Sequence, residues 1–213
     1  MAGIFITFEG IEGCGKSTQI RILNDTLKAK GEDTVLTREP GGTAIGEKIR
    51  QVLLNADFKA MFPLTELLLY AAARCQHVGE VIRPALDQGK IVLCDRYADA
   101  TTAYQGAARS IDKQFLKKIH QLSTNDLKPD LTLLLDCPVE LGLQRTRERE
   151  PELPEGASMD RFEKENLEFH QRVRNGYLQI AKEEPSRVKI INALDDIETV
   201  HQNIVQEVMR ILK

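Results

Sequence analysis

A glycine-rich turn between an apolar run and an amphipathic segment constrains this chain more than any other feature. Residues 10–17 read Gly-Ile-Glu-Gly-Cys-Gly-Lys-Ser, which fits the G-x-x-x-x-G-K-[ST] phosphate-loop pattern in full. The apolar run 4–9 precedes the turn, and a helical pattern follows it. Glycines let backbone N–H groups converge on phosphate oxygens, and a helix N-terminus favours negative charge. A nucleotide-binding loop follows from this context, whereas a chance pattern in a tight turn is the alternative.

The loop assigns a role to each of its polar side chains. Lys16 is expected to bridge the β- and γ-phosphates of ATP, and the Ser17 hydroxyl to ligate Mg²⁺. The predicted ATP-binding residues are Gly10, Ile11, Glu12, Gly13, Cys14, Gly15, Lys16, Ser17 and Thr18.

Five short apolar runs predict β-strands, and helical patterns separate them. The strands cover residues 4–9, 34–38, 91–95, 131–136 and 188–192, and the helices cover 15–30, 63–86, 115–122, 139–149, 160–182 and 197–212. Several strands are apolar nearly throughout, which is typical of a parallel sheet covered on both faces. The alternation of strands and helices predicts a doubly wound α/β fold.

Composition narrows the class of protein. The chain has 213 residues, and no stretch of linker composition divides it, so residues 1–213 are expected to form one domain. The formal net charge of -3 argues against a nucleic-acid partner, and no apolar run reaches bilayer-spanning length. The four cysteines lack Cys-x-x-Cys spacing, and an apolar strand begins close to Met1, which leaves no room for a cleavable leader. We therefore expect a cytoplasmic protein without a membrane partner.

Charged residues stand at the ends of two further strands. Arg38 ends the run 34–38, Asp95 ends the run 91–95, and Arg96 follows it directly. The carboxyl ends of parallel strands border one crevice, so these side chains are expected beside the phosphate loop. Asp95 can hold Mg²⁺ with Ser17, and the arginines indicate an acceptor that itself carries phosphate. A strand-end ion pair is the alternative for Asp95 and Arg96.

Nearly end to end, the chain resembles thymidylate kinases. The motifs that carry the resemblance are Phe-Glu-Gly-Ile-Glu-Gly at 8–13, Thr-Arg-Glu-Pro-Gly-Gly at 37–42, Tyr-Ala-Ala-Ala-Arg at 70–74, Asp-Arg-Tyr at 95–97, Ala-Tyr-Gln-Gly at 103–106, Pro-Asp-Leu-Thr at 129–132 and Asp-Arg-Phe at 160–162. The resemblance implies a nucleoside monophosphate kinase fold with a five-stranded parallel sheet, and a homodimer. It also implies transfer of phosphate from Mg²⁺·ATP to thymidine monophosphate.

The resemblance assigns an acceptor pocket. Tyr70 would stack on thymine and Arg74 would donate to a thymine carbonyl, since residues four apart share a helix face. The family more often has Phe at the position of Tyr70, and the ring of Tyr104 would crowd the 2′ position of the sugar. The substrate-binding residues implied are Arg38, Pro40, Gly41, Arg50, Tyr70, Arg74, Arg96, Thr101, Tyr104 and Gln105. Without the resemblance, the alternatives are a core position for Tyr70, a surface charge for Arg50 and an ordinary turn for residues 41–42.

A polar segment at 148–158 breaks the rhythm of strands and helices. It contains Pro151, Pro154 and Gly156, and it is either a solvated connector or a mobile lid, which the resemblance places at about 142–162. The phosphate loop has no arginine, so the chain resembles the bacterial type, in which lid arginines neutralise the transferred phosphate. The residues implied in catalysis are Lys16, Arg96, Arg145, Arg149 and Glu12, with Arg161 as a further lid candidate. A solvated helix face is the alternative for the lid arginines.

Two rival functions remain from the sequence. Another nucleotide or deoxynucleoside kinase is the nearest, and a nucleoside acceptor would require a general base such as Glu9 or Asp95. A nucleotide-dependent switch protein is the second. No Asn-Lys-x-Asp guanine-reading motif occurs, and the arginine-rich crevice argues against a switch.

Overall fold

Five parallel strands form a single sheet at the centre of the molecule, which we describe from a computed structural model over residues 3–149 and 160–212. The strand order is β2-β3-β1-β4-β5. The strands are β1 (Ile4–Glu9), β2 (Thr34–Arg38), β3 (Ile91–Asp95), β4 (Leu131–Asp136) and β5 (Val188–Asn192). Every strand has the bounds predicted from the sequence, and the predicted α/β class is confirmed.

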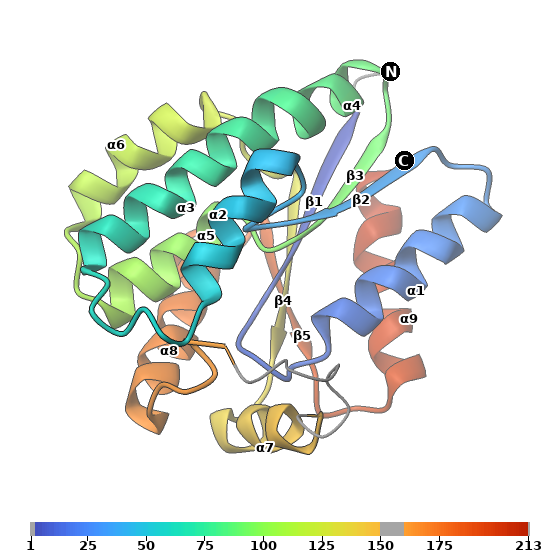
Figure 1. Ribbon diagram of the computed structural model, residues 1–213. Coiled ribbons are helices and arrows are strands. Elements are labelled where there is room, and N and C mark those ends of the chain that lie inside the picture. The colour runs from blue at the N-terminus through green and yellow to red at the C-terminus, as the bar shows by residue number, and fades with distance from the viewer. Residues whose placement is uncertain (1–2, 150–159, 213) are drawn as a thin grey trace.

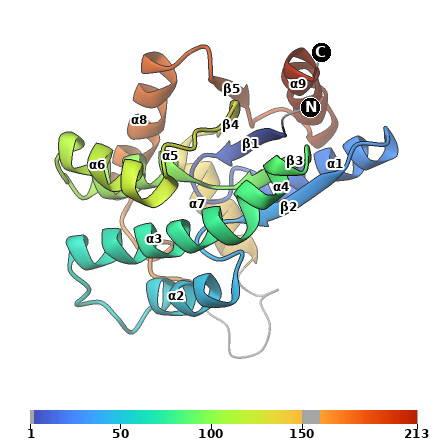
Figure 2. The ribbon, with the colours of Figure 1, turned by 90° about the horizontal axis from the view of Figure 1, so that it is seen from above.

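Helices cover both faces of this sheet. They are α1 (Lys16–Ala29), α2 (Ala44–Leu54), α3 (Pro63–His77), α4 (Arg83–Asp87), α5 (Ala98–Thr101), α6 (Lys113–Thr124), α7 (Val139–Arg149), α8 (Leu167–Glu183) and α9 (Ile197–Ile211), with two π-helical segments, η1 (Val78–Ile82) and η2 (Thr102–Ala108). Figures 1 and 2 show α1 and α9 on one side of the sheet and α3, α5, α6 and α8 on the other. The sheet is therefore wound on both sides, as its apolar strands require.

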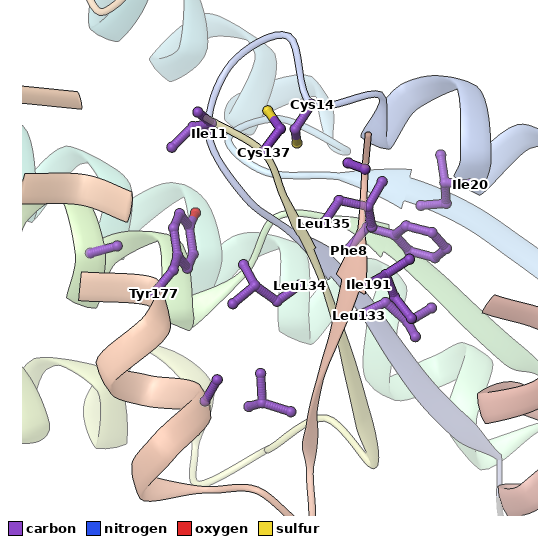
Figure 3. Close-up of a cluster of buried hydrophobic side chains, with 14 of the residues drawn as sticks. Phe8, Ile11, Cys14, Ile20, Leu133, Leu134, Leu135, Cys137, Tyr177 and Ile191 are labelled. Carbon is purple, nitrogen blue, oxygen red and sulfur yellow. The ribbon is translucent and has the colours of Figure 1, made fainter. Parts of the chain in front are cut away.

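The core follows the alternation of side chains along the strands. Leu134 of β4 points towards Tyr177 of α8, whereas Leu133 and Leu135 lie on the opposite side of the strand with Phe8 (Figure 3). All five side chains are at most 2% exposed. Because both faces bury apolar side chains, the strand ends are held in fixed positions at the edge of the sheet where the charged residues stand.

Strand register brings the predicted charged residues together. Phe8 of β1 pairs with Asp95 of β3, and Asp95 also pairs with Arg38 of β2. The phosphate loop leaves β1 at the same edge. This confirms the expectation that the strand ends border one crevice.

Two helix predictions need correction. The segment predicted as helix 160–182 is helical only from Leu167, because Asn166 caps α8 by accepting a hydrogen bond from the N–H of Phe169. Before the cap, Asp160 Oδ1 accepts from the N–H groups of Phe162 and Glu163, and these turns replace a helical ladder. The predicted helix 63–86 is interrupted by η1.

The helical segment 98–108, comprising α5 and η2, was not predicted from the sequence. It packs extensively on α8 and carries Thr101, Tyr104 and Gln105 into the interior. Within the described ranges, no helix combines the length and the apolar character that a bilayer crossing requires.

Candidate active site

A cleft of about 1070 Å³ opens at the carboxyl edge of the sheet, beside the phosphate loop. Most residues predicted to bind either substrate line this cleft. They are Glu12, Gly13, Cys14, Gly15, Lys16, Ser17, Thr18, Arg38, Pro40, Arg50, Tyr70, Arg74, Asp95, Arg96, Thr101, Tyr104, Gln105 and Arg145. Gly10, Ile11 and Gly41 are the loop positions that fall outside the lining formed by the described residues.

The phosphate loop packs backbone to backbone against the helix that leads into the predicted lid. Gly13 has a positive φ of 70°, and a Cβ there would collide with the carbonyl oxygen of Gly142 in α7. A Cβ at Gly142 would in turn meet the carbonyl oxygen of Glu12. Glycine at both positions is therefore required for this contact.

Lys16 folds over the loop that it follows. Its Nζ donates to the carbonyl oxygens of Gly10 at 3.1 Å and Ile11 at 2.7 Å, and it lies 3.4 Å from Cys14 Sγ. The residue is only 7% exposed. An ammonium group held at the mouth of a phosphate loop is positioned to exchange these carbonyl contacts for phosphate oxygens.

Ser17 and Asp95 meet at the other side of the loop. Ser17 Oγ donates to Asp95 Oδ2 at 2.9 Å, which joins the first turn of α1 to the end of β3. A hydroxyl and a carboxylate are hard oxygen donors of the kind that Mg²⁺ takes together with phosphate oxygens. The donor set therefore fits the metal predicted from the sequence.

A charged cluster forms around Glu12. Arg96 Nη2 lies 3.1 Å from Glu12 Oε1, the Tyr104 hydroxyl donates to the same oxygen, and His170 Nδ1 lies 3.2 Å from Glu12 Oε2. Burial on its own would raise the pKa of Glu12, but His170 and the Arg96 charge outweigh it and lower that pKa. Glu12 is thus held as a carboxylate, and with Arg96 it forms a fixed ion pair inside the cleft.

Arg96 is also tied to a second buried carboxyl group. Arg96 Nη1 donates to the Tyr177 hydroxyl at 3.0 Å, and that hydroxyl donates to Glu9 Oε2 at 2.8 Å. The backbone N–H of Tyr97 donates to Glu9 Oε1. Burial, reinforced by the charge of Asp99, raises the pKa of Glu9 to about 8. The backbone of Arg96 itself has a positive φ of 69°, so its guanidinium direction is set by an uncommon conformation that these contacts hold in place.

At the acceptor end, Arg74 is the most enclosed cation. The residue is 1% exposed, its Nε donates to Glu39 Oε2 at 2.7 Å, and its Nη2 donates to the Tyr97 carbonyl and to Thr101 Oγ1. Within the part of the chain that the structure describes, Nη1 is buried without a hydrogen-bond partner. The amide of Gln105 donates to the carboxylate of Glu66, and this hydrogen bond fixes the orientation of the Gln105 side chain.

Arg50 and Arg38 bring two cations to the same wall of the cleft. Arg50 Nη1 donates to the Pro40 carbonyl, and Arg38 pairs with Glu47 at 2.9 Å. Burial and the neighbouring Arg38 charge lower the pKa of Arg50. A partly buried guanidinium next to another is stabilised by an incoming anion, so this wall suits an acceptor phosphate.

Tyr70 is half-buried and lines the cleft, as the predicted stacking role requires. Its ring centroid lies 6.2 Å from that of Phe162. Burial, with Glu66 nearby, raises the pKa of its hydroxyl. Tyr70 also packs against the buried core, so the core alternative and the cleft position each describe part of its surroundings.

The lid arginines are placed differently from one another. Arg145 lines the cleft, and its Nη1 lies 3.5 Å from the carbonyl of Ala193 in the loop after β5. Arg149 ends α7, and its side chain, like the predicted lid residues Pro151, Pro154 and Gly156, lies outside the described residues. Arg161 is held by the carboxylate of Glu66 and by the Leu53 carbonyl, so in this structure it does not reach the phosphate loop.

Sequence reasoning missed several residues of the site. Glu39, His170 and Tyr177 contact predicted site residues, and His77 contacts Glu39, but none of the four was singled out for this role. For His170 and Tyr177 a signal existed, since residues seven apart lie on one helix face. The positions of Glu39 and His77 depend on a strand and a helix that meet only in the folded chain.

Comparison with known proteins agrees with this geometry. The family model for thymidylate kinase matches residues 8–204. The thymidylate kinase of Pelobacter propionicus is 52% identical over 98% of this chain and 94% of its own length, and that of Trichlorobacter lovleyi is 56% identical over 89% of each. The crystal structure of thymidylate kinase from Ehrlichia chaffeensis superimposes with a TM-score of 0.78 and 34% identity, covering 98% of this chain and 99% of that one. On the strength of these matches and of the cleft described above, the chain belongs to the thymidylate kinase family.

Proposed function

We propose that this cleft transfers the γ-phosphate of ATP to the phosphate of thymidine monophosphate, which makes thymidine diphosphate for dTTP synthesis. One observation carries the proposal: a phosphate loop with Lys16 and a second set of cations, Arg50 and Arg96, line the same cleft. A single nucleotide does not need both sets. Two anionic nucleotides with their phosphates facing each other do.

Phosphoryl transfer depends mainly on how the two phosphates are positioned and on how their negative charge is neutralised. The attacking oxygen belongs to a phosphate that is already anionic, so no general base has to remove a proton from it. Lys16 approaches the donor phosphates from the loop, and Arg96 approaches from the end of β3. Glu12 and Tyr177 orient the Arg96 guanidinium before substrate arrives, which removes part of the entropy cost of reaching the transition state.

Magnesium is the metal that this site fits, and Ser17 and Asp95 are the residues that would hold it, directly or through water. No group of three His, Cys, Asp or Glu side chains gathers as a metal cage in residues 3–149 or 160–212. Most oxygen ligands therefore have to come from nucleotide phosphates and water. When bound, the ion neutralises charge that develops on the phosphate oxygens.

At the base end, Tyr70, Arg74 and Gln105 form the acceptor pocket. The ring of Tyr70 offers a stacking surface, and Arg74 keeps one unpaired donor for a carbonyl oxygen. Tyr104 lies over the Arg96 guanidinium at 5.0 Å, where its ring limits the space beside the sugar. This arrangement supports a pyrimidine deoxynucleotide as acceptor.

A panel of acceptors tests the proposal. Purified protein is mixed with Mg²⁺·ATP and one acceptor at a time, and ADP release is coupled to NADH oxidation. Thymidine monophosphate should give the highest kcat/KM among the four deoxynucleoside monophosphates. Faster turnover of thymidine would assign a deoxynucleoside kinase, and slow ATP hydrolysis that no acceptor stimulates would assign a nucleotide-dependent switch.

We further propose a homodimer built on α3 and α6. Phe62, Leu64, Leu68, Ile111 and Phe115 line an apolar groove between these helices, and the side chain of Phe62 is 76% exposed. An apolar groove exposed to water is unfavourable, and covering it with a second copy of the chain lowers the free energy. Light scattering after gel filtration should give twice the chain mass, and Leu68→Asp should reduce it to the mass of one chain.

A cytoplasmic location remains part of the proposal. Cys14, Cys75, Cys94 and Cys137 are all free thiols, which suits a reducing compartment.

A further inference from the structure

A line of four polar side chains, three of them buried and Thr37 half-buried, runs beside the acceptor pocket from β2 to α3. Thr37 Oγ1 lies 2.6 Å from His77 Nε2, and His77 Nδ1 lies 3.0 Å from Glu39 Oε1. The other oxygen of Glu39 accepts from Arg74 Nε at 2.7 Å. His77, Arg74 and Glu39 are all at most 4% exposed, so water does not compete for these contacts.

A proton on His77 Nδ1 accounts for both hydrogen bonds of the imidazole. A neutral imidazole with its proton on Nδ1 donates to Glu39, and its Nε2 accepts from the Thr37 hydroxyl. Glu39 then receives two donors, one on each oxygen. The geometry fixes the carboxylate plane, and the carboxylate plane fixes the Arg74 guanidinium.

The surrounding chain encloses His77 closely. Gly42 has a positive φ of 77°, and a Cβ at that position would lie 2.6 Å from His77 Nε2. The imidazole therefore has little room to turn, and a residue of different shape would displace the loop that follows Pro40.

Arg74 lines the cleft, as Thr37 and Glu39 also do, whereas His77 is not among the described lining residues. The Nε and Nη2 of Arg74 are occupied by Glu39, the Tyr97 carbonyl and Thr101, while Nη1 has no partner among the described residues. A buried donor left unpaired costs free energy, and a carbonyl oxygen of the acceptor base would remove this cost. The value of that contact depends on the direction in which Nη1 is held.

We propose that His77 is a positioning residue for the acceptor base. It acts through Glu39, whose carboxylate it orients, and so holds Arg74 with Nη1 available to a thymine carbonyl. This inference rests on the proposed function, because it requires thymidine monophosphate in the pocket that Arg74 lines. It adds the requirement that the Nδ1 proton of His77, and not its bulk, sets the affinity for the acceptor.

Three substitutions at position 77 separate the two ring nitrogens. His77→Asn places an amide donor near the position of Nδ1, His77→Gln places one near Nε2, and His77→Leu has neither. We expect His77→Leu and His77→Gln to raise the KM for thymidine monophosphate about tenfold, the effect of one misdirected charged hydrogen bond. His77→Asn should stay within about threefold of the parent, and the KM for ATP and kcat should change little in all three.

Two further variants complete the test. His201 is also buried and bonds a threonine hydroxyl through Nε2, at 3.0 Å from Thr26 Oγ1, but it lies on α9 outside the cleft lining of the described residues. His201→Gln should leave both KM values unchanged, and thermal melting should show every variant folded. Arg74→Met should raise the KM for thymidine monophosphate by more than any change at His77.

The outcomes distinguish the two proposals. If Arg74→Met leaves the acceptor KM unchanged, Arg74 does not contact the base and the acceptor pocket of the proposed function is wrong. If Arg74→Met raises that KM while His77→Asn and His77→Gln behave alike, the pocket stands and the positioning role of His77 is overturned.

Discussion

Arg96 Nη2 lies 3.1 Å from Glu12 Oε1, and this ion pair joins the end of β3 to the phosphate loop across the centre of the cleft. The pair is mostly buried, with 19% of the Arg96 side chain and 12% of the Glu12 side chain exposed. Buried pairs of this kind are weak stabilisers, because desolvation offsets most of the attraction. The Arg96–Glu12 pair matters instead because it holds the Arg96 guanidinium in place before the phosphates bind.

Arg96→Lys should therefore damage catalysis more than folding. A lysine keeps the charge but cannot contact Glu12 and Tyr177 at once, since its single ammonium lacks the planar fork of a guanidinium. We expect kcat to fall on the order of 100-fold, with a change of only a few degrees in Tm. Steady-state kinetics and thermal melting measure the two quantities. Arg210→Lys, in the exposed pair with Glu207, is the matched control and should alter neither.

Ser17→Ala should weaken the binding of Mg²⁺ at the site. The substitution removes the hydroxyl that donates to Asp95 at 2.9 Å, and with it one oxygen donor of the proposed magnesium site. The Mg²⁺ concentration for half-maximal rate, at fixed ATP, should rise about tenfold. Thr26→Ser on the same helix is the control. An unchanged magnesium requirement would show that Ser17 does not take part in holding the ion.

Arg145 and Arg149 should separate into two roles. The Arg145 guanidinium lies beside the Ala193 carbonyl, in the part of the cleft lining that the loop after β5 contributes. Arg145→Ala should raise the KM for ATP about fivefold to tenfold, as loss of one contact with the donor nucleotide does. Arg149→Ala should lower kcat with little change in the acceptor KM.

Arg147 lies between these two residues on α7 and is exposed, so Arg147→Ala serves as the control for loss of charge. Equal increases in the KM for ATP for Arg145→Ala and Arg147→Ala would count against a specific contact of Arg145 with the donor nucleotide. Full turnover of Arg149→Ala would show that the lid arginine is not the catalytic one.

Glu9 should make the stability of the protein depend on pH. Burial raises the pKa of Glu9 from 4.5 to about 8, so between these values the folded chain holds a proton that the unfolded chain has lost. The free energy of unfolding should then fall as pH rises through this window, by at most about 1.4 kcal/mol per pH unit. Glu9→Gln should flatten that slope. Urea unfolding of both proteins between about pH 5 and pH 8 measures it, and parallel slopes would remove the assignment to Glu9.

The sequence predicted the sheet better than it predicted the helices. Each strand is a short, mostly apolar run that ends at a polar or charged residue, so pattern alone placed its limits. The turns at 160–166 were wrongly predicted as helix. The side-chain oxygens of Asp160 and Asn166 accept backbone hydrogen bonds there and override the helical pattern locally. The segment 98–108 has no such apolar period, and its helical form depends on packing against α8.

In the candidate site, too, some residues could be predicted from local patterns and others could not. Lys16, Ser17 and Asp95 were predicted because a motif or a strand end fixes them in the sequence. Contacts such as His77 with Glu39, or Tyr177 with Glu9, join residues 38 and 168 positions apart, and no local pattern brings them together. What a side chain touches from a distant segment is set by the tertiary structure, and these supporting contacts decide how firmly a predicted residue is held.

The meeting of Gly13 with Gly142 gives the two halves of the active site a shared boundary. With no side chain between them, the main chain of one segment packs directly on the main chain of the other. A methyl group added at either glycine would meet a carbonyl oxygen of the opposite segment, so alanine at position 13 or 142 should displace the phosphate loop and α7 together.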